Sequence, residues 1–213
     1  MAAGWFSNIK LRLQTSKLAA DLNNQIETMR RLSHIAQNSD DKALLSIANF
    51  NLCILLFRRD FQFLFNDTLL ERNMTKKNLL ARQLAVSLFD FLERIHSLIG
   101  TGIRPEIQKS SLPQTIREEM AALGREIGQL REKHGSYLSE LRNVAGAHRD
   151  LDGLLQLHWI EATDIDKILS IAQQVSEVHA TLMAAWIVAT QSYLERTLSS
   201  SNYPLPPGTD TVR

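Results

Sequence analysis

The chain has 213 residues, of which 44% are hydrophobic and 22% are charged. This composition is that of a globular protein, and the length suits one domain with or without a tail, so disorder throughout is excluded. The 24 basic and 23 acidic side chains leave a formal net charge of +1. Because proteins that coat long duplex DNA carry a broad basic surplus, that class is excluded, and any contact with nucleic acid is expected to be local.

The sequence predicts a cytoplasmic protein. Its one cysteine, Cys53, has no partner for an internal disulfide, and we expect it to be a buried small hydrophobe in a reducing compartment. The N-terminus lacks the charged segment and apolar core of a secretory signal. No stretch approaches about 18 uninterrupted apolar residues, so no transmembrane helix is expected. Four apolar residues near the N-terminus are accompanied by three basic ones, which leaves open a short helix lying on a membrane surface. The apolar residues are Trp5, Phe6, Ile9 and Leu13, and the basic ones are Lys10, Arg12 and Lys17.

Apolar residues recur every three to four positions along the whole chain, the spacing of amphipathic helices, and no strand-like alternation of useful length occurs. The first helix is expected to end at the turn-forming residues 38–41. The second is apolar on more than one face and is expected near the centre of a bundle. The five expected helices cover about 11–37, 41–66, 75–100, 113–143 and 163–198.

Particular residues are expected at the helix ends. Thr75 and Thr163 are predicted N-caps of the third and fifth helices. A left-handed glycine within 100–102 is predicted to end the third helix, and Pro113 suits the first turn of the fourth. Three glycines inside the fourth helix are expected to allow close packing, or a bend at the last of them: Gly124, Gly128 and Gly135.

These elements predict an all-α, up-down helical bundle of about five long helices. Residues 1–198 are expected to form a single domain. Residues 199–213, rich in proline and serine, are predicted to be a disordered tail.

Several kinds of catalytic site have no motif in this sequence. It lacks a Gly-x-Ser-x-Gly elbow, a phosphate-binding glycine loop with a lysine, and a zinc-type Cys/His pairing. Glu93 and His96 have the spacing of one di-iron ligand pair, but such sites need two pairs and two further glutamates, so a solvated helix face is expected there. His179 lies on an apolar stripe and is predicted to be a core histidine with one hydrogen bond. No metal or cofactor is expected.

One short segment gathers residues suited to cutting RNA: Arg142, Asn143 and His148. The planar arginine fork fits phosphate oxygens, and asparagine can both donate and accept. Histidine can take a proton from the 2′-hydroxyl or give one to the leaving oxygen, while arginine stabilises the charged phosphorane. A structural role is open as well, with Arg142 bound to helix-terminal carbonyls and residues 148–150 forming a solvated loop.

The run 142–150, with Arg142, Asn143, Ala147, His148 and the Arg-Asp pair after it, resembles the motif of the HEPN superfamily. Proteins of that superfamily carry an arginine, a polar residue and a histidine, with four to six residues between arginine and histidine. The motif here lies between two long helices, and residues 81–92 are similar to the helix that precedes it in abortive-infection HEPN proteins. The resemblance covers roughly residues 76–196.

The resemblance implies a metal-independent endoribonuclease, of the kind found as toxins or phage-defence effectors. It implies Arg142, Asn143 and His148 as catalytic residues and Arg149 as an RNA-binding residue. Two motifs are expected to meet across a homodimer, and a separate antitoxin protein is among the implied partners, whereas duplex DNA is not. Some HEPN proteins have lost cleavage and only bind RNA or a partner protein, which is the alternative function.

Overall fold

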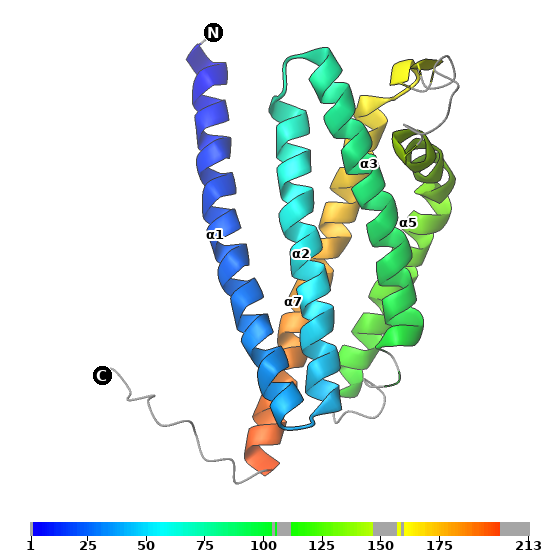
Figure 1. Cartoon of the computed structure of the whole chain (residues 1–213). Coiled ribbons are helices and arrows are strands. Elements are labelled where there is room, and N and C mark those ends of the chain that lie inside the picture. Colours follow the sequence, from blue (N-terminus) through cyan, green and yellow to red (C-terminus); the bar gives the residue numbers. More distant parts are fainter. Residues whose placement is uncertain (1, 104, 106–111, 147–156, 159, 201–213) are drawn as a thin grey trace.

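A computed structural model describes residues 2–103, 105, 112–146, 157–158 and 160–200, with side chains described except at 2–16, 101, 144–146, 198 and 200. Five long helices run alternately up and down (Figure 1). They are α1 (Ala2–Asn38), α2 (Lys42–Leu70), α3 (Met74–Ser97), α5 (Gln114–Gly146) and α7 (Ile165–Ser200), and a π-helical turn, η1 (Leu98–Gly102), follows α3. The described part of the chain contains no strand, so the predicted all-α bundle is confirmed. None of the helices described is long and apolar enough to cross a membrane.

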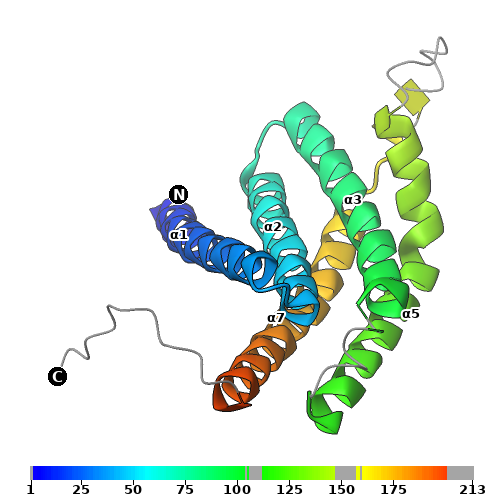
Figure 2. The ribbon, with the colours of Figure 1, turned by 60° about the horizontal axis from the view of Figure 1, so that its bottom comes forward.

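The main core lies between α2, α3, α5 and α7, because the apolar stripes of these four helices face one another. Figures 1 and 2 both show α1 beside α2 at one edge of the bundle and α5 beside α3 at the opposite edge. Burying one large apolar side chain contributes about 1.5–3 kcal/mol. The largest fully buried side chains are Trp186, Phe61, Ile47, Ile54, Leu84, Leu88, Leu92, Ile95, Ile127, Leu138, Leu141 and Ile168.

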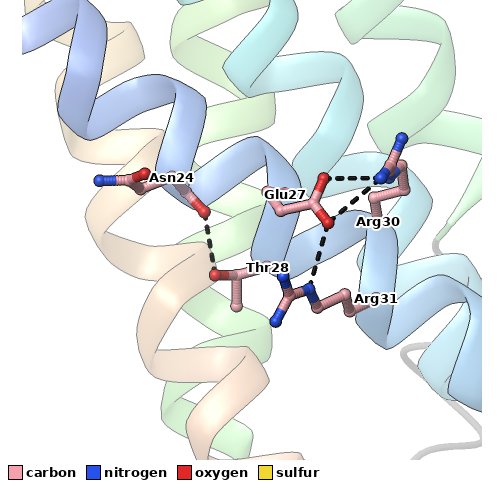
Figure 3. Close-up of polar contacts among 5 residues, drawn as sticks. All are labelled: Asn24, Glu27, Thr28, Arg30 and Arg31. Atoms are coloured by element: carbon pink, nitrogen blue, oxygen red, sulfur yellow. Dashed lines mark hydrogen bonds and ion pairs between the residues drawn. The ribbon is translucent and has the colours of Figure 1, made fainter.

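The outer face of α1 is polar. Glu27 forms ion pairs with Arg30, at 2.9 Å, and with Arg31, at 3.1 Å, and the Thr28 hydroxyl donates to the carbonyl of Asn24 at 2.9 Å (Figure 3). Such exposed contacts within one helix add little stability. The position of α1 therefore depends on its packing against α2, with Leu22 and Ala36 buried, rather than on these pairs.

Two predicted N-caps are wrong. The side chain of Asn73, rather than that of Thr75, accepts a hydrogen bond from the amide of Lys76 at the start of α3. At the start of α7, the Asp164 side chain accepts from the amide three residues later, at 2.9 Å, in place of Thr163. An N-cap side chain must accept an amide two or three residues on, and asparagine and aspartate do this at least as well as threonine.

Four helix boundaries lie beyond those expected from the sequence. The first helix begins at Ala2 instead of residue 11, and the second continues to Leu70. The fourth helix continues past residue 143 to Gly146, and the fifth reaches Ser200. Residues 201–213 of the predicted tail lie outside the described residues.

The end of α3 differs from the predicted glycine C-cap. Neither Gly100 nor Gly102 has a left-handed φ. Instead the helix widens into η1, where the amide of Ile103 donates to the carbonyl of Leu98 at 2.8 Å. This longer hydrogen-bonded turn occupies a carbonyl that a left-handed cap would otherwise satisfy.

Two glycines let α5 pack closely against α3 and η1, as predicted for the close packing of this helix. A Cβ atom at Gly124 would lie 3.0 Å from Cγ2 of Ile99, and one at Gly128 would lie 3.3 Å from Cε1 of His96. Gly135 makes no comparable approach, since a Cβ atom there would make only an ordinary contact at 3.9 Å. Close packing therefore explains the first two glycines and leaves the third without a structural reason.

Cys53 is half-buried, whereas full burial was expected. Phe50 and Ile54 occupy the core-facing side of this part of α2 and are almost fully buried. Since consecutive helix residues point about 100° apart, Cys53 lies at the edge of the core-facing stripe.

Candidate functional site

Arg142 lies near the end of α5 and contacts α3. Its Nε atom is 3.4 Å from Oδ1 of Asp90, and its guanidinium carbon is 5.2 Å from the centre of the Phe89 ring. The side chains of Arg142 and Asp90 are 50% and 58% exposed, so these contacts orient the guanidinium while solvent still reaches it. The expectation that Arg142 binds helix-terminal carbonyls is replaced by this contact with the neighbouring helix.

Asn143 is exposed and follows Arg142 within the helix. The other predicted site residues, His148 and Arg149, lie outside the described residues, as does Asp150. In the sequence, His148 comes two residues after the last residue of α5. The described half of the candidate site is therefore an exposed Arg-Asn pair at the end of α5.

Sequence reasoning missed Phe89 and Asp90 as neighbours of Arg142. Phe89 is half-buried at the edge of the core and Asp90 is exposed, and their contact with Arg142 depends on how α3 and α5 are placed along each other. An exposed arginine–carboxylate pair is weak in water. A phosphate group, which accepts two hydrogen bonds from an arginine fork, can therefore displace the Asp90 carboxylate.

Glu93 and His96 have structural partners on α5. Oε1 of Glu93 accepts from Nε of Arg131 at 2.6 Å. The half-buried His96 ring packs against Gly128, where no side chain stands in its way, so the expectation of a solvated face at His96 is wrong. No cluster of three or more histidine, cysteine, aspartate or glutamate side chains suited to a metal occurs in the part of the chain that the structure describes.

His179 is a core histidine, as predicted. It is fully buried, and its Nε2 atom lies 3.0 Å from the carbonyl oxygen of Ile54. Because a carbonyl only accepts, Nε2 carries the proton and donates it. The rings of Phe57 and Phe91 flank the imidazole. Burial lowers the pKa of His179 to about 3, so the ring is neutral near pH 7.

The comparisons with known proteins add no relative. No family model, no curated protein and no solved structure matches this chain. The resemblance to the HEPN superfamily therefore rests on the motif at 142–150 and on the helical bundle that carries it.

Proposed function

We propose that the protein is a metal-independent endoribonuclease of HEPN type, with Arg142, Asn143 and His148 as its catalytic residues. The observation that supports this most is the exposure of Arg142, half of whose side chain faces solvent beside the exposed Asn143. A guanidinium that held the bundle together would instead be buried and fully paired. The site is local, which agrees with a net charge of +1.

In the proposed reaction, His148 takes the proton of an RNA 2′-hydroxyl, and the 2′-oxygen attacks the adjacent phosphorus atom. The bond from phosphorus to the 5′-oxygen breaks, and that oxygen takes up a proton. The products are a 2′,3′-cyclic phosphate and a 5′-hydroxyl. Arg142 stabilises the charge on the non-bridging oxygens, Asn143 orients the hydroxyl or the imidazole, and Arg149 binds a neighbouring phosphate.

The contact between Arg142 and Asp90 suits an anion-binding site whose guanidinium is already oriented before RNA binds. The carboxylate holds the guanidinium in one place in the free protein, at 3.4 Å and with both groups exposed. An RNA phosphate then exchanges with the carboxylate and gains the bidentate geometry that arginine offers. Binding is expected to weaken as salt rises, because the contact is ionic.

A homodimer would complete the site. One chain supplies one His148, whereas cleavage needs both a base for the 2′-hydroxyl and an acid for the leaving oxygen. A two-fold axis beside the end of α5 would bring a second His148 to the same phosphate. A separate antitoxin protein that covered this surface would block cleavage, as expected for a toxin or a phage-defence effector.

The alternative is a non-catalytic HEPN-like module that dimerises and binds RNA or a partner protein. The Asp90 contact also fits this alternative, because the carboxylate partly neutralises the charge that cleavage would use. Under this alternative, RNA or a partner binds at Arg142 and His148 without any bond being broken.

The deciding experiment incubates the purified protein with single-stranded RNA in EDTA and analyses the RNA ends. The expected products carry 2′,3′-cyclic phosphates. His148→Ala is expected to abolish cleavage, and Arg142→Lys to reduce it strongly, while Arg94→Lys, at an exposed position elsewhere on α3, serves as the control. Binding without cleavage by the wild-type protein would favour the alternative. A strict need for a divalent ion, or full activity of His148→Ala, would contradict the proposal.

A further inference from the structure

A groove of about 810 Å³ lies between α3, η1 and α5. Its lining residues on α5 belong to the first two thirds of that helix, whereas Arg142 lies near the last residue of α5. Its volume is within the range of small-molecule sites, about 300–1,000 Å³. Its apolar lining consists of Ile99, Ile103, Met120, Ala121 and Trp186.

The groove is shaped by η1 and by glycines. Gly100 lies in the π-helical turn, and a Cβ atom there would meet nothing within 4 Å. On the opposite wall, Gly124 and Gly128 line the groove without side chains. Short π-helical segments are frequent at functional sites, because the wider turn re-aims the side chains around it.

Two buried ring nitrogens at this groove have no hydrogen-bond partner within the described structure: Nε1 of Trp186 and Nδ1 of His96. Trp186 is fully buried, and its Nε1–H can only donate. Buried polar atoms in folded proteins almost always have a partner. A bound molecule with hydrogen-bonding groups on its apolar body would provide the missing partners.

Some of the charged side chains around the groove have partners within the described structure and others do not. Oε1 of Glu118 accepts from the Gln114 amide at 2.8 Å, and Glu132 lies close enough to Arg131 for their charges to interact. By contrast, the guanidinium groups of Arg117 and Arg125 line the groove, and neither is paired with any residue that the structure describes. Two acidic and two basic side chains line the groove, and Arg117 and Arg125 are the two guanidinium groups there that an anion can pair with.

We propose that this groove binds a small aromatic acid. A planar ring system would lie on the apolar lining, hydrogen-bond to the nitrogens of Trp186 and His96, and place an anionic group against Arg117 or Arg125. A saturated fatty acid would leave the two nitrogens without partners, and a simple inorganic anion would leave the apolar lining empty. The site is separate from Arg142, so it stands independently of the proposed ribonuclease.

The probe for the first test is anilinonaphthalene sulfonate, an aromatic acid whose fluorescence rises in an apolar site. Trp5→Phe with Trp159→Phe leaves Trp186 as the one tryptophan, because the chain has three. Titration of this folded protein with the probe is expected to quench Trp186 in a saturable, one-to-one manner. Absence of saturable binding under native conditions would overturn the proposal.

Variants then locate the site. Arg117→Gln and Arg125→Gln are each expected to weaken binding of the sulfonate, by roughly ten-fold for the arginine that pairs with the anion, whereas Arg94→Gln leaves it unchanged. The uncharged analogue phenylnaphthylamine should bind all three variants alike. If the arginine variants weaken both probes equally, or neither, the assignment to an acid is wrong.

A last variant fills the groove. Ala121 is exposed and lines it, so Ala121→Phe is expected to abolish binding of both probes while a thermal melt shows a folded protein. Ala122→Phe, at the adjacent position outside the groove lining, is the matched control. Binding that survives in folded Ala121→Phe would overturn the proposal. If that variant fails to fold, the contrast between the two arginine variants and Arg94→Gln decides alone.

Discussion

Tyr193 on α7 donates its hydroxyl to Asp41, the residue that caps α2, at 2.8 Å from Oδ1 and 3.0 Å from Oδ2. The same carboxylate accepts the amide of Leu44 at 2.9 Å. One side chain thus ends the turn between α1 and α2 and joins it to the last helix. Asp40, the preceding residue, has a φ of 52°, which fixes the sharp reversal that brings Asp41 to this position.

Tyr193→Phe is expected to lower the free energy of unfolding by about 1–2 kcal/mol, because it removes a hydrogen bond to a charged acceptor. Urea unfolding followed by circular dichroism measures this. Tyr137→Phe is the matched control, since the Tyr137 hydroxyl makes only a longer contact, at 3.4 Å, with the Asp164 carbonyl. Equal unfolding midpoints for wild type and Tyr193→Phe would contradict the structural importance of this contact.

The same tyrosine predicts a loss of stability in alkali. Burial, together with the bond to Asp41, raises the pKa of Tyr193 to about 12 from an ordinary 10. Between these values the unfolded chain has released the proton and the folded chain has kept it, so the contribution is full below pH 10 and falls as pH rises toward 12. Unfolding curves at pH 8, 10 and 11 should show a smaller decline in Tyr193→Phe than in wild type.

Acid should destabilise the protein through His179. Its folded-state pKa is lowered to about 3, whereas the ordinary value is 6.5. As pH falls from 6.5 toward 3, His179 binds a proton in the unfolded chain but not in the folded chain. The free energy of unfolding therefore falls. His179→Gln keeps an amide that can donate to the Ile54 carbonyl but cannot titrate. We expect a shallower decline between pH 6.5 and 4 in this variant, with His34→Gln, at an exposed position, behaving like wild type.

The periodicity of apolar residues was sufficient to predict the five helices and their buried faces, because burial repeats with the helical turn. Helix ends were less predictable. At the start of α3, Asn73 and Thr75 both suit an N-cap, and only the position of the first turn decides between them. Thr75 alone was predicted, because residue type does not give the position of the first turn.

The contacts around the candidate site could not be predicted from the sequence, for a different reason. Arg142 and Asp90 are 52 positions apart in the chain, and their contact depends on how α3 and α5 are placed along each other. The groove depends on η1, a turn whose glycines also fit an ordinary helix end. Local patterns carry no information about either relationship.

The free energy of unfolding of an Arg142 variant shows whether Arg142 serves a functional site or stabilises the fold. Arg142→Ala should change the free energy of unfolding by no more than about 0.5 kcal/mol, because the side chain is half exposed and its ion pair is weak. Leu88→Ala, at a fully buried position in the core, should cost about 2–5 kcal/mol. Thermal melts compare the two directly. An Arg142→Ala protein that melts as low as Leu88→Ala would identify Arg142 as a structural residue.

Replacing Asp90 tests whether its carboxylate competes with an RNA phosphate for the Arg142 guanidinium. If the carboxylate competes with RNA for the guanidinium, Asp90→Asn should tighten RNA binding by up to about five-fold, the equivalent of one exposed ion pair. The gain should shrink as salt rises, because screening weakens the pair that has been removed. Fluorescence anisotropy with labelled single-stranded RNA measures this binding. The experiment uses proteins that also carry His148→Ala, the substitution expected to abolish cleavage.

Asp60→Asn is the matched control for this experiment. Asp60 forms a comparable exposed pair with Arg59, at 3.2 Å, and its replacement changes the net charge by the same amount. General electrostatic attraction would tighten binding equally in both variants, whereas competition at Arg142 tightens it only in Asp90→Asn. Weaker binding by Asp90→Asn would show instead that the carboxylate positions Arg142 for the bound RNA, and would rule out competition between Asp90 and the phosphate.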